Sequence, residues 1–368
     1  MSTSRHPAQV TAVSGPVVPE SGVRVLPVSG LGEIREGDDL VAELAAALVP
    51  LSPRPGDVLC VSTKIVSKAL GLRVPAEERE RAIAEAAVRT VARRLHTHVV
   101  TSVVQIPSGP IMAAAGVDSS NAPDGPLLLP EDPDACARTV REGLLAALGV
   151  ELGVVLTDTS SRIWRVGVGD IALGAAGVAS LQDLRGGTDA DGRPLSVTVR
   201  NLADELAAAA DLVKGKSSGV PAALVRGVPE ATGQDIAARE LSRTGPEDWF
   251  RRPSLESVWV ALGLAPEQEP VARMSPEPAA ERISRALAVA AVPRDAGRPS
   301  TAVARVSTPE GPRPHIVVHA VGATADALID AATLAERIRT ALGAESLGVP
   351  LPEITLEIVH TISEEEQP

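Results

Sequence analysis

Aromatic residues are almost absent from this chain. They make up 1% of its 368 residues, and there is no tyrosine. A hydrophobic core must therefore consist of Ala, Val, Leu and Ile, and the 44% of apolar residues is enough to build a large one. The scarcity argues strongly against proteins that stack single-stranded nucleic-acid bases on aromatic side chains.

Positive charge is also scarce. The chain has 35 Lys and Arg residues against 47 Asp and Glu residues, a formal net charge of -12. This balance argues against a general nucleic-acid-binding protein and against binding to an anionic membrane surface. A polyanionic ligand must be met by locally placed cations, by backbone N–H groups or by a metal ion.

Cysteines and long apolar runs are few as well. Cys60 and Cys136 are too few for a disulfide framework or a zinc cage, and their apolar surroundings predict buried free thiols. The first 22 residues lack the charged and apolar blocks of a signal peptide. The longest uncharged run, 99–117, contains two prolines and is a poor membrane span. We therefore expect a cytoplasmic protein without a membrane segment.

The length and the residue pattern predict a mixed α/β (α+β) fold with four parts. We expect a flexible tail at 1–22, a large main domain at 23–252, a linker rich in proline and charge at 253–275, and a small α+β domain at 276–368. The acidic end of the chain and the C-terminal domain carry no motif that assigns them a role.

Hydrophobic periodicity and turn residues predict most of the elements. Expected helices start at Asp38 or Asp39 and at a capping Asp134, and others cover 76–95, 202–213, 277–291 and 325–342. Strands are expected at 23–28, 57–61, 99–105, 152–156, 195–199, 221–225, 301–306, 315–321 and 353–360. The small-residue segment 171–180 fits neither pattern clearly.

Two segments that follow apolar strands have the residues of a phosphate site. In 29–34, glycines would let the backbone approach a ligand, and the following helix start attracts phosphate; the alternative is a plain turn. In 61–68, hydroxyl residues and two lysines could hold phosphate oxygens; the alternative is a helix start with solvated lysines.

Two further segments have the residues of a metal site. Asp118 and Asp158 follow apolar stretches on separate loops 40 residues apart, so they could converge on one ion. Carboxylates with the nearby Thr159 hydroxyl suit Mg²⁺ or Mn²⁺. The Asn121 amide could form hydrogen bonds with a ligand edge that carries both a donor and an acceptor. The alternative for each aspartate is a local turn or a helix cap.

Cationic residues complete this set. Arg162 and Arg165 could clamp an anion, or could pack on Trp164 between them. Lys214 and Lys216 could compensate a helix dipole or contact phosphate. The residues by themselves indicate an α/β enzyme that handles phosphate with a hard divalent cation, and they leave the reaction open.

The order and spacing of eight motifs resemble the coenzyme F420-0:L-glutamate ligase family. The motifs occur at 26–40, 67–68, 115–121, 128–135, 157–167, 170–177, 203–216 and 226–227. The resemblance thus covers 23–252 and implies that this segment is the catalytic domain. It implies an enzyme that joins L-glutamate to a deazaflavin coenzyme precursor through an acyl phosphate. It also implies GTP as co-substrate, Mg²⁺ or Mn²⁺ as cofactor with K⁺ as a further candidate, and a homodimer.

The resemblance assigns roles residue by residue. It implies GTP binding by Leu31, Gly32, Glu33, Ile34, Thr63, Lys68 and Asn121. It implies metal ligation by Asp118, Asp158 and Thr159. We expect Lys68, Arg162 and Arg165 to act on the transferring phosphoryl group and on the acidic substrates. The alternatives are a ligase of the same fold with a different acid and amine, and a non-catalytic nucleotide-binding or scaffolding homologue.

Overall fold

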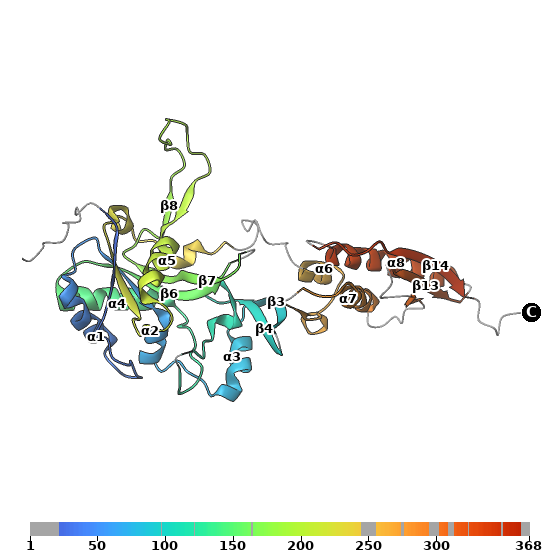
Figure 1. Cartoon of the computed structure of the whole chain (residues 1–368), viewed down its shortest axis with the longest axis horizontal. Coiled ribbons are helices and arrows are strands. Elements are labelled where there is room, and N and C mark those ends of the chain that lie inside the picture. The colour runs from blue at the N-terminus through green and yellow to red at the C-terminus, as the bar shows by residue number, and fades with distance from the viewer. Residues whose placement is uncertain are drawn as a thin grey trace, which may run out of the picture. The chain divides into compact units, whose positions relative to one another are not determined.

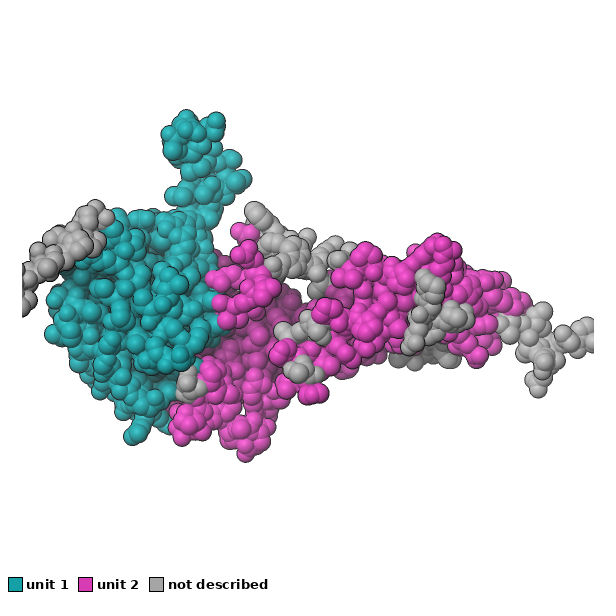
Figure 2. All heavy atoms as spheres, viewed as in Figure 1, with its two compact units in different colours: residues 1–70, 132–159, 169–238 teal, residues 71–131, 160–168, 239–368 magenta. Residues whose placement is uncertain are grey.

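The chain forms two compact units in this computed structural model (Figures 1 and 2). The structure describes residues 22–96, 98–120, 122–162, 165–243, 255–273, 276–293, 302–307, 313–322, 324–346 and 349–361. Unit 1 comprises 1–70, 132–159 and 169–238, and unit 2 comprises 71–131, 160–168 and 239–368. The mixed α/β class is confirmed, and the segment predicted as one catalytic domain, 23–252, contributes to both units.

Unit 1 is built on a five-stranded sheet. Its strands are, in spatial order, β1 (Arg24–Pro27), β10 (Ala222–Arg226), β2 (Val58–Ser62), β6 (Gly153–Ser161) and β7 (Val168–Ala176). β10 is antiparallel to both β1 and β2, whereas β2 and β6 are parallel. β1, β2 and β6 therefore all end at one edge of the sheet. A hairpin of β8 (Leu181–Asp183) and β9 (Val199–Asn201) extends from this unit.

Helices cover both faces of this sheet. α1 (Leu40–Leu48), α2 (Thr63–Ala69) and α4 (Pro133–Leu148) pack on the face that carries Leu59 and Val61. α5 (Leu202–Lys214) packs on the other face, where the Cys60 Sγ lies 3.6 Å from the Leu206 carbonyl oxygen. Alternate residues of one strand thus serve two cores, which explains the continuous apolar character of β2.

Asp134 is not the helix cap that the sequence predicted. Asp132 caps α4 and accepts from the Ala135 N–H at 2.9 Å. The Asp134 side chain is instead buried, and its Oδ1 accepts from the Ala175 N–H at 2.9 Å and the Ala238 N–H at 2.8 Å. A Cβ at Gly174 would lie 2.3 Å from the Pro133 carbonyl oxygen, so glycine lets β7 approach the start of α4 this closely.

Unit 2 contains a sheet in the order β11 (Ala272–Arg273), β3 (Arg89–His96), β4 (Val99–Gln105) and β5 (Ile111–Ala113). The predicted long helix at 76–95 is wrong in its second half. α3 (Arg79–Glu85) is short, and β3 follows as an antiparallel partner of β4. Arg and Glu suit a helix, but pairing with β4 gives the backbone of β3 its hydrogen bonds.

The C-terminal part of unit 2 has its own core. The elements are α6 (Leu255–Ala261), α7 (Ala279–Ala291), β12 (Ala302–Ser307), β13 (His315–Val321), α8 (Ala325–Glu345) and β14 (Thr355–Thr361). Their types match the prediction for 276–368. The described part of the expected linker, 253–275, is structured instead, because Trp259 of α6 is 1% exposed and packs in this core with α7 and α8.

The remaining elements agree with the sequence in type, with one exception. Of the strand expected at 195–199, only the last residue is in a strand, since β9 begins at Val199 and Leu195 belongs to the preceding loop. The uncertain segment 171–180 lies mostly in β7. The expected tail 1–22 falls outside the described residues except for Gly22.

Replacing Asp134 should destabilise the protein more than removing the cap beside it. Asp134→Ala leaves two buried N–H groups without an acceptor, and each such group costs about 1–3 kcal/mol. The matched control Asp132→Ala removes one cap and should cost about 0.5–2 kcal/mol. Urea unfolding measures both losses, and a smaller loss for Asp134→Ala would contradict this account.

Glu277 should make the C-terminal core sensitive to acid. Burial opposes its ionisation, but Arg285, at 2.6 Å and 2.7 Å, and the Arg273 N–H outweigh burial and lower its pKa. The ionised Glu277 contributes its full stabilisation at a pH above 4.5, the ordinary pKa of a glutamate. This stabilisation is lost as the pH falls through the lowered pKa of Glu277 in the folded protein. Unfolding free energy should therefore fall less in Glu277→Gln than in the exposed control Glu281→Gln when the buffer is acidified. Equal losses in the two variants would contradict it.

Candidate functional site

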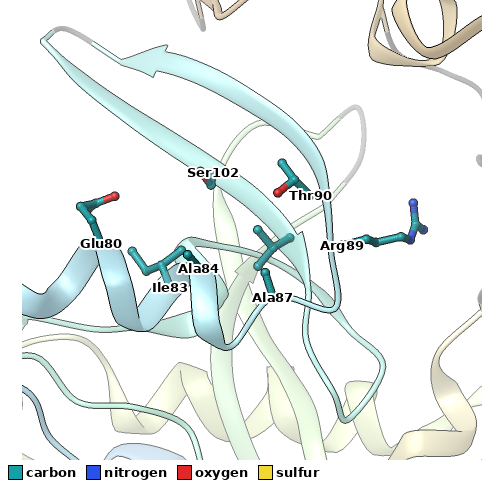
Figure 3. A pocket seen from close by; sticks show the side chains of 8 residues that line it. Glu80, Ile83, Ala84, Ala87, Arg89, Thr90 and Ser102 are labelled. Atoms are coloured by element: carbon teal, nitrogen blue, oxygen red, sulfur yellow. The ribbon is translucent and has the colours of Figure 1, made fainter. Parts of the chain in front are cut away.

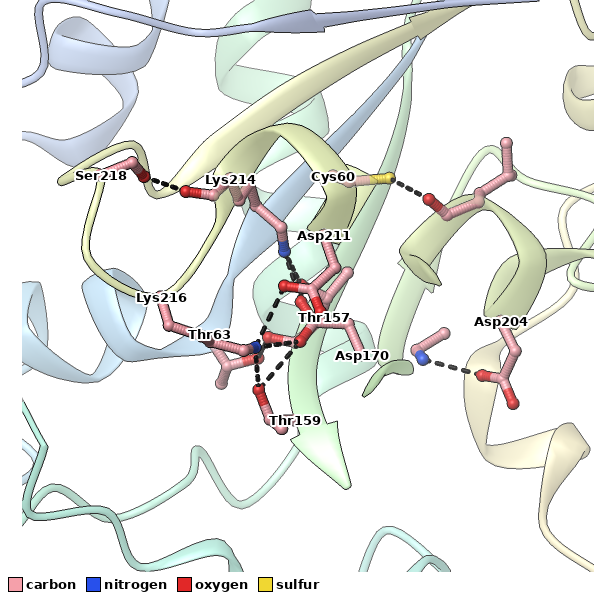
Figure 4. A network of polar contacts seen from close by, with 12 residues as sticks. Cys60, Thr63, Thr157, Thr159, Asp170, Asp204, Asp211, Lys214, Lys216 and Ser218 are labelled. Atoms are coloured by element: carbon pink, nitrogen blue, oxygen red, sulfur yellow. Dashed lines mark hydrogen bonds and ion pairs between the residues drawn. The ribbon is translucent and has the colours of Figure 1, made fainter. Parts of the chain in front are cut away.

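A cluster of polar side chains lies on the α5 face of the unit 1 sheet (Figure 4). β6 contributes Thr157 and Thr159, β7 contributes Asp170, and the end of α5 contributes Lys214. The cluster sits where β2 and β6 end, and the Thr63 hydroxyl, at the start of α2, donates to the Thr157 carbonyl oxygen at 3.1 Å. The strand ends thus bring segments distant in sequence to one place.

Asp170 and Lys214 form a buried ion pair at the centre of this cluster. The Lys214 Nζ donates to Asp170 Oδ2 at 2.5 Å and to the Thr157 hydroxyl at 2.6 Å. The Thr157 hydroxyl in turn donates to Asp170 Oδ2 at 2.9 Å. The side chains of Asp170 and Lys214 are 6% and 4% exposed, so both charges are nearly removed from water.

The pKa of Asp170 is lowered despite its burial. Burial raises the pKa, but the charge and hydrogen bond of Lys214, the charge of Lys216 and the hydrogen bond of Thr157 together outweigh it. Asp170 is therefore an ionised carboxylate that holds two lysines.

Lys216 brings a more accessible cation to the same cluster. Its Nζ donates to the Thr159 hydroxyl at 2.6 Å, to Asp170 Oδ1 at 3.2 Å and to Asp211 at 3.0 Å. Burial works to lower its pKa, but hydrogen bonds and charges of Asp211 and Asp170 raise it overall, so Lys216 stays charged. Its side chain is 58% exposed, which leaves it available to an anion.

The glycine-rich segment 29–34 lies between β1 and α1 and contacts the next predicted segment. The Lys68 Nζ donates to the Glu33 carboxylate, with Lys68 buried and Glu33 exposed. Gly30 has a φ of +90°, and a Cβ on either glycine of this loop would meet open space. The structure thus joins two segments in which the sequence predicted phosphate binding, with an accessible backbone beside a lysine.

The predicted metal-binding residues belong to different units and contexts. In unit 2, Asp118 accepts from the Ser120 N–H at 2.6 Å and the Ser120 hydroxyl at 3.0 Å, which is a local turn. In unit 1, Asp158 and Thr159 are neighbours in β6, so their side chains point to opposite faces. Within the described ranges, no group of three or more His, Cys, Asp or Glu residues is arranged to hold a metal ion.

The remaining predicted site residues lie in two places, beside the β6–β7 connection and in the glycine-rich loop of unit 1. Arg162 and Arg165 are exposed, and the Arg165 N–H donates to the Arg162 carbonyl oxygen at 3.2 Å. Asn121 and Trp164 lie outside the described residues. Leu31 and Ile34 pack against the unit 1 core and anchor the glycine loop.

The sequence reasoning missed the acidic side of the cluster. Asp170 stands alone in a run of small and apolar residues, and Asp211 lies on the helix that carries Lys214. A single carboxylate inside an apolar strand is a signal of a buried partner, because an unpaired buried charge is costly. The partner itself could not be read from the sequence.

Both cysteines are free, as predicted, but the prediction that both are buried is wrong for Cys136, which is only half-buried. Cys60 is buried beside the cluster, and burial raises its pKa to about 12, against the opposing charge of Lys214. A thiol with so high a pKa is a poor nucleophile, so Cys60 is a packing residue.

A cavity of about 260 Å³ lies in unit 2 between α3 and the β3–β4 hairpin (Figure 3). Ile83 and Ala84 form part of its lining, and its charged residues, Glu80 and Arg89, lie at opposite ends. Because no charged groups converge there, the cluster of unit 1 is the better candidate for chemistry.

Removing the Asp170 charge should strongly destabilise unit 1. Asp170→Asn leaves the buried Lys214 ammonium without its counter-charge, which costs about 3–5 kcal/mol. The control Asp211→Asn affects an exposed lysine and should cost less than about 1 kcal/mol. Denaturant unfolding compares the two, and the double variant Asp170→Leu/Lys214→Met should recover stability because it buries no charge. A Asp170→Asn variant as stable as the control would refute the role of the pair.

Comparison with known proteins places the chain in a family. The family model described as F420-0:Gamma-glutamyl ligase matches residues 30–227. The coenzyme F420:L-glutamate ligase of Methanopyrus kandleri is 39% identical over 249 residues, which are 62% of this chain and 98% of that protein. The proteins of the same name from Haloarcula marismortui and Archaeoglobus fulgidus are 38% and 39% identical, over 65% and 62% of this chain and 97% of each relative.

None of the helices in the described part of the chain combines the length and apolar character needed to cross a membrane.

The family resemblance read from the motifs is confirmed by the comparisons. The family model's range, 30–227, includes the segments that build the cluster in unit 1. The chain belongs to the F420-0:gamma-glutamyl ligase family and is an enzyme of the ligase class.

Proposed function

We propose that this protein is a GTP- and divalent-metal-dependent ligase that forms an amide between L-glutamate and the deazaflavin precursor coenzyme F420-0. Its relatives bear the name coenzyme F420:L-glutamate ligase, and the chain covers nearly their full length. The observation that carries the proposal is the gathering of a glycine loop, a paired Lys68 and an exposed Lys216 in one unit. Such a set suits the phosphates of a nucleotide.

The chemistry requires activation of the acid. An amine cannot displace oxide from a carboxylate, so the carboxylate oxygen first attacks the γ-phosphorus of GTP, and GDP leaves. The glutamate amine then attacks the acyl carbon of the resulting acyl phosphate, and inorganic phosphate leaves as the amide forms. The proton that the attacking amine loses passes to solvent.

The chain's residues have separate tasks in this proposal. Leu31, Gly32, Glu33, Ile34, Thr63, Lys68 and Asn121 bind GTP. Lys68 supplies fixed positive charge where negative charge develops on the phosphoryl group, with Glu33 holding its ammonium in place. Arg162 and Arg165 are exposed and can hold the acidic acceptor or glutamate.

The proposed metal ligands have suitable chemistry. Asp118 and Asp158 provide the carboxylate oxygens that Mg²⁺ and Mn²⁺ prefer, so the donor set fits a hard divalent cation. When bound, the cation would neutralise charge on the transferring phosphoryl group. The Thr159 hydroxyl donates to Asp170 and accepts from Lys216, so ligation of a cation by Thr159 would use its second lone pair.

A turnover assay tests the proposal directly. Purified protein with Mg²⁺ or Mn²⁺ should release phosphate from GTP and form the amide only when both the deazaflavin precursor and L-glutamate are present. No turnover with all three substrates would refute it. The second candidate is a ligase of the same fold that joins a different acid and amine. A mass-spectrometric screen of acids and amines would identify such a pair by its amide product.

The homodimer and the cytoplasmic location belong to the same proposal. Both rest on the family resemblance and on the composition of the chain. Light scattering of the full chain measures the assembly, and a monomeric mass would exclude the dimer.

Asp118 and Asp158 should be essential for turnover. Asp118→Asn and Asp158→Asn each remove a metal-binding charge and should lower kcat by about 10²–10³-fold, an effect expected when a group that stabilises transferring charge is lost. Asp124→Asn is the matched control, because this exposed residue of the same loop pairs with Arg73. Normal turnover in either variant, or an equal loss in the control, would exclude that aspartate as a ligand.

A further inference from the structure

A second cavity lies in unit 1 at the edge of the sheet opposite the Asp170 cluster. It has a volume of about 290 Å³. β1 and β2 begin at this edge and β10 ends there, whereas the cluster lies where β2 and β6 end. Three arginines, Arg24, Arg54 and Arg226, line the cavity with a single carboxylate, Asp57.

Two of these arginines face each other across neighbouring strands. Arg24 of β1 and Arg226 of β10 are direct partners in the antiparallel register, so their side chains emerge on the same face of the sheet. Like charges directly opposite each other destabilise a strand pair. In a chain with a net charge of -12, two cations in this position call for a compensating negative charge.

Asp57 compensates only one of the two. Its carboxylate accepts from Arg226 Nε at 2.9 Å and Nη2 at 2.7 Å, and from the Arg54 N–H at 2.9 Å. Arg226 Nη2 also donates to the Ser52 carbonyl oxygen at 2.9 Å. These contacts hold Arg226 through Nε and Nη2.

Hydrogen-bond donors remain available on two residues that line the cavity. Within the residues that the structure describes, Arg226 Nη1 has no hydrogen-bond partner. The Arg24 side chain, although half-buried, likewise makes no hydrogen bond or ion pair with any described residue. Two guanidinium groups therefore offer free donors at one solvent-open pocket.

We propose that this cavity binds a small oxyanion with two negative charges, held between Arg24 and Arg226. Guanidinium groups bind carboxylate and phosphate oxygens in pairs, so one such anion can satisfy both side chains and cancel their repulsion. Organic ligand sites are usually about 300–1,000 Å³, so a cavity of about 290 Å³ suits phosphate or a short dicarboxylate better than a nucleotide. The site is independent of the proposed ligase reaction, because it lies at the other edge of the sheet.

Calorimetry and thermal unfolding of the full chain test this site. The probes are inorganic phosphate and glutarate, a dicarboxylate without the amine that amide formation needs, at ionic strength held constant with NaCl. The variants are Arg24→Gln and the control Arg185→Gln, an exposed arginine that pairs with Asp183 on the β8–β9 hairpin. We expect one or both anions to raise the Tm of the unchanged protein and of the control, and to bind Arg24→Gln at least about tenfold more weakly.

The unliganded proteins give a second readout. Without added anion, Arg24→Gln should unfold at the same temperature as the unchanged protein or higher, because it removes the repulsion between two cations. A purely structural arginine would give a lower temperature. Phosphate bound at the nucleotide site would persist in Arg24→Gln, so the difference between the variants reports on this cavity alone.

The proposal fails under three results: neither anion binds the unchanged protein, both bind Arg24→Gln as tightly as the control, or Arg24→Gln is less stable without anion. Binding of phosphate alone or glutarate alone supports the site and identifies which class of oxyanion it takes.

Discussion

The ionised Asp170 carboxylate inside unit 1 is the constraint on which the candidate site depends. Burial alone would favour its neutral form, and the Lys214 ammonium opposite makes the charged form stable. The pair joins β7 to the end of α5, and its further contacts fix the Thr157 and Thr159 hydroxyls. Lys216 is placed as a consequence, because the same carboxylate accepts from it. One buried charge thereby orients an accessible cation.

The two edges of the unit 1 sheet differ in how completely their cationic side chains are paired with carboxylates. At the edge with the Asp170 cluster, lysines are matched by Asp170 and Asp211. At the opposite edge, three arginines meet one carboxylate. In a chain that is acidic as a whole, only the second of these edges has a local excess of positive charge. Our two proposals differ accordingly: one places an anion beside an exposed, paired lysine, and the other places an anion between opposed arginines.

Local signals predicted the elements that depend on neighbouring residues. Asp39 caps α1, and the apolar spacing of α5 and α8 follows the predicted helices. The predictions failed where a residue distant in the sequence determines the local structure. Residues 89–96 look helical by charge, yet β4 supplies their backbone partners. Asp134 looks like a cap, yet two N–H groups from 41 and 104 residues away occupy its carboxylate.

Motif order and hydrophobic patterning were sufficient to identify the family and the mixed α/β class, and to select the segments proposed to bind phosphate. The spacing of those motifs is a local property, so it could be read without coordinates. Only the tertiary structure paired Asp170 with Lys214, 44 residues apart, and set Arg24 opposite Arg226. Both arrangements depend on strand order and register, which arise from hydrogen bonds between distant segments. Charged residues that are far apart in the sequence come to attract or repel each other only when the sheet forms.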